Sequence, residues 1–161
     1  MHQFSISRRT FSIRLLTLVA SSALAVNVFA KTSAADNVLL AKSAPAGIDP
    51  AGYLVSEKLD GVRAQWDGKV LRFRSGRTIA APAWFIAKLP KEPLDGELWI
   101  GRGQFDAVSG TVRKVKPVDI EWQKVNYMVF ELPAGSGDFK DRALALESIV
   151  NTTAWPQLQA I

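Results

Sequence analysis

Residues 53–66, Y-L-V-S-E-K-L-D-G-V-R-A-Q-W, decide how the rest of the 161-residue chain is interpreted. An apolar run opens this stretch, an Asp-Gly pair follows, and alternating apolar and polar residues close it. The order predicts a hairpin with a short buried strand at 53–55, a tight turn at Asp60-Gly61 and a returning strand at 62–66. Such a hairpin would hold the amine of Lys58 close to a carboxylate and a guanidinium.

Few other catalytic groups are available in the chain. It has no cysteine, and its single histidine, His2, lies in an N-terminal leader segment. Residues after the leader include no histidine or cysteine, so they cannot form a Ser-His-Asp triad, a Cys-His pair or a zinc site built on histidine or cysteine. Lys58 is the strongest candidate nucleophile, and cations near it, Arg63 and a bound metal ion, would favour the neutral amine that attacks. The alternative is a solvated lysine beside an ordinary turn.

Four segments, in order, resemble motifs of the ATP-dependent DNA ligases, a superfamily that also includes RNA ligases and mRNA-capping enzymes. The segments are K-L-D-G-V-R at 58–63, R-F-R-S-G-R at 72–77, L-D-G-E-L-W-I at 94–100 and Y-M-V-F-E-L-P at 127–133. A-P-A-W-F at 81–85 and G-R-G-Q-F-D at 101–106 further resemble the small secreted bacterial ligases. The resemblance covers the chain from about residue 54 to residue 133.

This resemblance implies an α+β fold. The family's nucleotidyltransferase (adenylation) domain consists of twisted, largely antiparallel sheets with flanking helices and is similar to ATP-grasp folds. Residues 50–161 would form the N-terminal part of such a domain, left incomplete. The family's later metal-binding and lysine motifs and its C-terminal OB-fold are absent from this chain, so we expect an inactive fragment, with a degraded gene product as the alternative.

The resemblance also implies roles for single residues. Lys58 would be the catalytic nucleophile. The implied nucleotide-binding residues are Lys58, Asp60, Gly61, Arg63, Arg74, Glu97 and Phe130, and Asp60 and Glu97 are the implied metal ligands. Phe130 would stack on adenine, the alternative being an ordinary core residue, and an unrelated exposed carboxylate is the alternative for Glu97. The family more often has Asp where Glu131 stands, so the role of Glu131 stays open.

Basic residues gather in two further places. Arg72, Arg74 and Arg77 fall within six residues, and Arg113, Lys114 and Lys116 within four. The predicted DNA-binding residues are Arg72, Arg77, Arg113, Lys114 and Lys116, while solvated edges are the alternative for both clusters. Net charge does not decide between these alternatives, because the chain without its first thirty residues carries seventeen basic and fifteen acidic groups.

The rest of the chain shows strand and helix patterns in alternation. Strands are expected at 69–74, 94–100 and 125–132, and helices at 82–89, 104–114 and 139–150. In the second strand, alternation puts Asp95 and Glu97 on one face and apolar residues on the other. In the last helix, Leu144, Leu146 and Ile149 are expected to be buried.

Residues 1–30 resemble an export signal. Arg8, Arg9 and Arg14 precede or begin an apolar run at 15–26 that is too short to span a bilayer, and V-F-A at 28–30 fits a cleavage site. S-R-R-T-F also matches a twin-arginine signal, although paired arginines occur in ordinary signals too. We expect a lead-in segment at 31–49 and a periplasmic or secreted monomer without stable membrane association, an uncleaved membrane anchor being the alternative.

These observations predict an ATP-dependent DNA ligase. It would seal nicks in duplex DNA through a lysine-AMP intermediate, using ATP and Mg²⁺, in DNA repair, recombination and replication. One alternative is a non-catalytic nucleotide-binding or nucleic-acid-binding module that keeps the fold. Another is an RNA ligase or a capping-type nucleotidyltransferase, because nothing in these residues identifies the base or the sugar.

Overall fold

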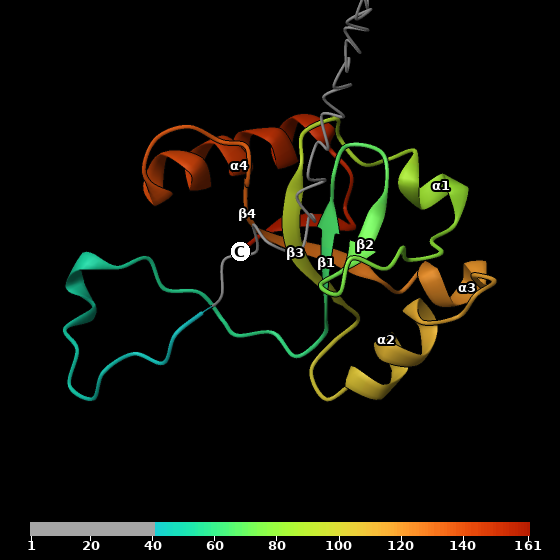
Figure 1. Ribbon diagram of the computed structural model, residues 1–161, viewed down its shortest axis with the longest axis horizontal. Coiled ribbons are helices and arrows are strands. Elements are labelled where there is room, and N and C mark those ends of the chain that lie inside the picture. Colours follow the sequence, from blue (N-terminus) through green and yellow to red (C-terminus); the bar gives the residue numbers. More distant parts are fainter. Residues whose placement is uncertain (1–40) are drawn as a thin grey trace, which may run out of the picture. The chain divides into compact units, whose positions relative to one another are not determined.

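A five-stranded sheet organises the computed structural model, which describes residues 41–161 (Figure 1). Its strand order is β2-β1-β3-β4-β5, and all neighbours are antiparallel except β4 and β5, which are parallel. The strands are β1 (Val62–Trp66), β2 (Leu71–Phe73), β3 (Leu94–Trp99), β4 (Asn126–Glu131) and β5 (Leu158–Ala160). The predicted α+β class with a largely antiparallel sheet is confirmed.

Within residues 41–161, four α-helices accompany the sheet. They are α1 (Ala83–Ile86), α2 (Phe105–Val112), α3 (Asp119–Trp122) and α4 (Phe139–Thr153), and a short 3₁₀ turn, η2 (Pro50–Gly52), precedes β1. None of the helices between residues 41 and 161 is long and apolar enough to cross a membrane. The predicted export signal at 1–30 and the first ten residues of the lead-in at 31–49 lie outside the described residues.

One face of the sheet is apolar and holds the core. Along β1, Val62, Ala64 and Trp66 are buried on this face while the residues between them are half-buried on the other. Every helix adds buried residues to the same cluster, including Phe85 from α1 and Trp122 from α3. The ring of Phe85 meets those of Trp122 and Trp155 edge-on, each at 4.9 Å. The helices therefore cover the apolar face, and the polar face carries the site residues.

Tyr127 and Gly96 fasten the middle of the sheet. Tyr127 is fully buried, and its hydroxyl donates to the carbonyl oxygens of Ala64 (2.9 Å) and Leu94 (3.1 Å). A β-carbon at Gly96 would lie 2.5 Å from the Met128 carbonyl oxygen and 2.9 Å from the Tyr127 ring. The glycine of L-D-G-E is therefore needed for β3 and β4 to approach over the tyrosine.

The predicted hairpin at 53–66 is wrong in its first half. Tyr53, Leu54 and Val55 are 62%, 62% and 81% exposed and belong to no strand. Both edges of β1 are already occupied, by β2 and β3, so no edge is left for residues 53–55 to pair with. Gly61 does not form a hairpin turn either. Instead its backbone packs on β3, where a β-carbon would come 2.3 Å from the Leu98 carbonyl oxygen.

The other predicted elements are confirmed, with shifted ends. The three strands appear as β2, β3 and β4, and the three helices as α1, α2 and α4. The prediction that Leu144 is buried is wrong, since it is 57% exposed, while Leu146 on the same helix is 2% exposed. The two leucines are two positions apart, so they lie on different sides of the helix. Leu146 has Ile149 and Val150 three and four positions on, and both pack against the core with it, whereas Leu144 has Glu147 and Ser148 at the same spacing.

We predict that Gly96→Ala destabilises the protein by about 1–3 kcal/mol, the usual range for overpacking, because the added methyl group meets backbone atoms that cannot rotate away. Urea unfolding followed by circular dichroism would measure this loss. Gly110→Ala in α2 is the matched control: its β-carbon meets nothing within 4 Å, and alanine favours helix. Equal effects of the two substitutions would contradict the role given to Gly96.

Candidate functional site

The polar face of the sheet brings β1 and β3 residues side by side. The register pairs Arg63 with Glu97 and Gln65 with Asp95. Side chains alternate between the two faces of a strand, so these four polar groups lie together opposite the core. The sequence predicted that Arg63 lies near Lys58 and that Asp95 and Glu97 share one strand face. The structure adds Gln65 to this group.

Arg63 is fixed by a two-point ion pair with Asp95. Its Nε and terminal nitrogen donate to the two carboxylate oxygens of Asp95 at 3.0 Å and 2.7 Å. The side chain of Asp95 is 3% exposed and that of Arg63 is 20% exposed. The Asp95 hydrogen bond raises the pKa of Arg63, and burial opposes it. Arg63 thus carries a permanent positive charge in a defined orientation.

The ring of Phe130 lies next to this guanidinium. The Arg63 Cζ atom is 5.2 Å from the ring centroid, within cation-π distance. Phe130 is half-buried at the end of β4, and its neighbours Val129 and Glu131 are buried. The predicted aromatic position is therefore on the polar face with one of the predicted cations, rather than in the core.

Gly61 contacts Glu97 directly, and the charges of Lys58 and Asp60 act on the same carboxylate. The Gly61 N–H donates to the Glu97 carboxylate at 3.2 Å. Burial raises the pKa of Glu97 above its ordinary value, while the Gly61 hydrogen bond and the charges of Arg63 and Lys58 lower it and the charge of Asp60 raises it. Lys58 and Asp60 are thus close enough to act electrostatically on Glu97, although both side chains are exposed.

The two carboxylates predicted as metal ligands do not form a protein-only metal site. Within residues 41–161, no group of three or more His, Cys, Asp or Glu side chains is placed to hold a metal ion. Mg²⁺, however, is commonly bound by one or two carboxylates together with substrate phosphates and water. Asp60 and Glu97, close enough to influence each other, fit that manner of binding.

Four arginines line a cleft of about 330 Å³ beside this group, here called the arginine cleft: Arg63, Arg74, Arg77 and Arg113. No carboxylate is among the described residues that line it. Phe73 forms part of its wall, and its ring centroid lies 4.8 Å from the Cζ atom of Arg77 and 5.7 Å from that of Arg113. The cleft offers concentrated positive charge and planar donors, which suit phosphate oxygens.

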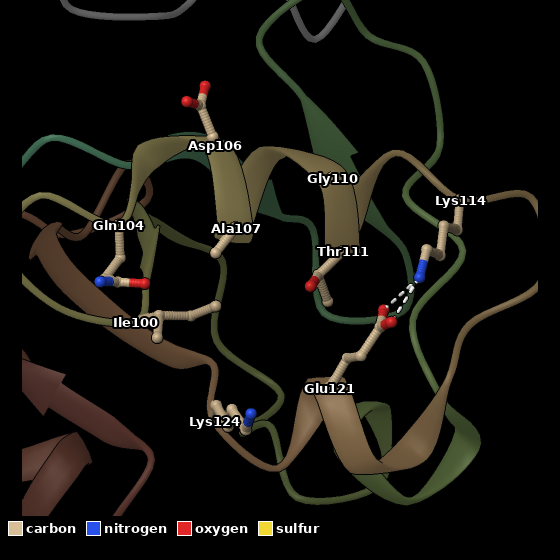
Figure 2. A pocket seen from close by; sticks show the side chains of 9 residues that line it. All are labelled: Ile100, Gln104, Asp106, Ala107, Gly110, Thr111, Lys114, Glu121 and Lys124. Carbon is tan, nitrogen blue, oxygen red and sulfur yellow. Dashed lines mark hydrogen bonds and ion pairs between the residues drawn. The ribbon is translucent and has the colours of Figure 1, made fainter.

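The remaining predicted DNA-binding residues lie elsewhere. Lys114 crosses a separate pocket of about 350 Å³ between α2 and α3 and donates to both carboxylate oxygens of Glu121, one at 2.6 Å (Figure 2). Arg72 is half-buried and pairs with Asp67 at 3.5 Å, and Lys116 is exposed; neither lines the arginine cleft. The structure therefore brings Arg77 and Arg113 together and leaves these three apart from them.

Two carboxylates have structural partners that the sequence did not predict. Asp95 was placed only on a strand face, and its pairing with Arg63 depends on the register of two strands 32 positions apart. Glu131 accepts from Arg142 at 2.7 Å and 3.0 Å, which ties β4 to α4. This hydrogen bonding lowers the pKa of Glu131. The open question about Glu131 is thus answered structurally, since its carboxylate joins two elements.

We predict that the stability of Glu97→Gln relative to the native protein increases as the pH rises. The folded state holds the Glu97 proton more tightly, because its pKa is raised above the ordinary value of 4.5, so native stability falls as pH rises from 4.5 through the folded pKa. Glutamine does not titrate. Thermal unfolding between pH 4 and pH 8 would show the difference growing and then levelling off. A constant Glu97→Gln difference across this range would contradict the assignment.

Comparison with known proteins supports the resemblance seen in the sequence. No protein-family model matches the chain. It is 37% identical over 97 residues to a curated DNA ligase of Haemophilus influenzae (strain ATCC 51907 / DSM 11121 / KW20 / Rd), covering 60% of this chain and 35% of that protein. A solved structure from a structure-function analysis of Lig E DNA ligases, concerned with DNA binding with a minimal scaffold, shares 43% identity and a TM-score of 0.65.

The match to the solved structure covers 71% of this chain and 45% of that one, so the chain spans less than half the length of either relative. Both relatives are DNA ligases, and one matches in fold as well as in sequence. The predicted resemblance is therefore confirmed: over the region compared, this chain is similar to DNA ligases in sequence and in fold.

Proposed function

We propose that this chain belongs to the adenylation half of an ATP-dependent DNA ligase, with Lys58 as its nucleophile. The observation that carries the proposal is the geometry of the polar face: Asp95 holds Arg63 beside Phe130, and Gly61, three residues after Lys58, donates to Glu97. The similarity to two DNA ligases supports a ligase-related function. The arginine cleft beside the group gives the nucleic-acid phosphates a place to bind.

In the first step the neutral Nζ of Lys58 attacks the α-phosphorus of ATP. A P–N bond forms, the bond from the α-phosphorus to the bridging oxygen breaks, and pyrophosphate leaves with that electron pair. Positive groups held in place before the reaction stabilise charge that grows on the phosphate oxygens. Arg63 meets this requirement because Asp95 holds its guanidinium at two points.

The adenine and the metal would use the remaining polar-face residues. Phe130 presents a half-buried aromatic ring on which a base can stack. Asp60 and Glu97 would hold Mg²⁺ together with phosphate oxygens, and the ion would supply further positive charge to the triphosphate. Glu97 also accepts the Gly61 N–H, which fixes the backbone immediately after the reactive segment.

Sealing of the nick would follow in two more steps. An oxygen of the 5′-phosphate at the nick attacks the AMP phosphorus and the P–N bond to Lys58 breaks. The 3′-hydroxyl on the other side of the nick then attacks the 5′-phosphate, AMP leaves, and the phosphodiester bond forms. The arginine cleft lies against Gly61 and Arg63, so phosphates held by Arg77 and Arg113 would lie close to the reactive lysine. Continuity between the two sites favours catalysis on DNA over nucleotide binding alone.

We predict that Lys58→Ala and Lys58→Arg both abolish formation of the protein-AMP adduct while leaving the fold intact. Alanine lacks the amine, and arginine stays protonated and does not attack. Incubation with ATP labelled at the α-phosphate, followed by denaturing gel electrophoresis, measures the adduct. Exposed Lys69→Ala is the control and should keep the label. Label retained on either Lys58 variant would reject Lys58 as the nucleophile, and label taken from GTP instead of ATP would favour a capping-type enzyme.

We predict that Arg77→Ala weakens binding of nicked duplex DNA and lowers the slope of log affinity against log salt by about 0.9, the value for one lost phosphate contact. Fluorescence anisotropy between about 50 mM and 200 mM salt measures both quantities. Lys114→Ala is the matched control, since Lys114 is paired with Glu121 outside the cleft. Equal slopes for the two variants would reject the cleft as the DNA site, and tighter binding of nicked RNA would point to an RNA ligase.

A further inference from the structure

The segment that carries Lys58 has no strand or helix to hold it. Residues 54–60 form no regular element, and the side chains of Ser56 and Lys58 are exposed. A backbone without ladder hydrogen bonds and with little burial opens easily. Placing an amine within reach of a phosphorus atom therefore requires contacts between this segment and other parts of the protein, here called ties.

The first tie lies on the C-terminal side of Lys58. The Gly61 N–H donates to Glu97 at 3.2 Å, and the Gly61 backbone packs against Leu98 too closely for a β-carbon. Both partners belong to β3. This contact fixes the C-terminal end of the segment but not its N-terminal end.

The second tie lies immediately before Lys58. Both carboxylate oxygens of Glu57 accept from Arg102, Oε1 from Nε at 2.8 Å and Oε2 from a terminal nitrogen at 2.7 Å. Arg102 follows the end of β3 and has a glycine on each side, of which Gly103 has a φ of +70°. The strand that supplies Glu97 thus continues into the turn that supplies Arg102.

Stability does not explain this pair. The side chain of Arg102 is 79% exposed and that of Glu57 is 51% exposed, and exposed ion pairs contribute little to folding. A two-point contact between planar groups does define an orientation, however. The hydrogen bond from Arg102 lowers the pKa of Glu57, so the pair persists across the neutral range.

We infer that Arg102 is a positioning residue that holds Glu57 and thereby restricts the position of Lys58, the next residue in the chain. The inference rests on the proposed function of Lys58. Lys58 lies between two ties, at Glu57 and at Gly61, and both are made by β3 and the turn after it. With Arg102 removed, the lysine remains but spends less time in the reactive position.

Hydrogen exchange measured by mass spectrometry tests the tie without requiring activity. Amides of residues 53–60 should exchange about two- to fivefold faster in Arg102→Ala, the modest effect of an exposed pair. Glu57→Ala and the double variant should show the same increase, because each removes the same contact. Lys114→Ala, which breaks another exposed pair, is the control and should leave these amides unchanged. Unchanged exchange in Arg102→Ala, or additive effects in the double variant, would overturn the inference.

The rate of adduct formation supplies the second readout. At saturating ATP, Arg102→Ala should form the Lys58-AMP adduct more slowly with little change in the ATP concentration needed for half-maximal rate, because the nucleotide contacts remain. A change in the half-maximal concentration alone would overturn a positioning role. If the native protein forms no adduct, the proposed function fails, and the exchange result still decides whether Arg102 orders the segment.

Discussion

The two-point ion pair between Arg63 and Asp95 is the constraint on which the site depends. Asp95 is buried, and burying a carboxylate is unfavourable unless a cation and hydrogen bonds compensate it. Arg63 provides both, so the pair fixes the register of β1 against β3 as well as the direction of the guanidinium. Phe130 and Glu97 are then placed relative to one fixed charge. The polar face is consequently organised by the same contact that aligns its strands.

The two glycines of the ligase-like motifs are needed because they have no side chain, not because they make the chain flexible. Gly61 and Gly96 both sit where a β-carbon would strike backbone atoms of a neighbouring strand. Gly96 lets β4 approach over Tyr127, and Gly61 lets the segment that carries Lys58 lie against Leu98. Neither has a positive φ. Close approach of three backbones, at β1, β3 and β4, thus concentrates the polar groups in a small area.

Local patterns predicted most of the fold, and long-range register accounts for what they missed. Alternation in 94–100 placed Asp95 and Glu97 on one face, and the helix pattern at 104–114 identified α2. The apolar run at 53–55 has strand character, but β2 and β3 already flank β1, a fact visible only in three dimensions. Among the site residues, sequence grouped Arg113 with Lys114, although the helix end separates them: one faces Phe73 and the other Glu121.

Arg77 and Arg113 both lie within cation-π distance of the Phe73 ring and both line the arginine cleft, so one aromatic partner holds two like charges in the same cleft. Their mutual repulsion is relieved when an anion enters between them, which makes the cleft a trap for small oxyanions. Sulfate from a precipitant or phosphate from a buffer would be attracted to it and would compete with any larger polyanion. Crystals grown from ammonium sulfate are therefore suited to revealing the anion position, and solution work on this protein calls for chloride salts with an amine buffer.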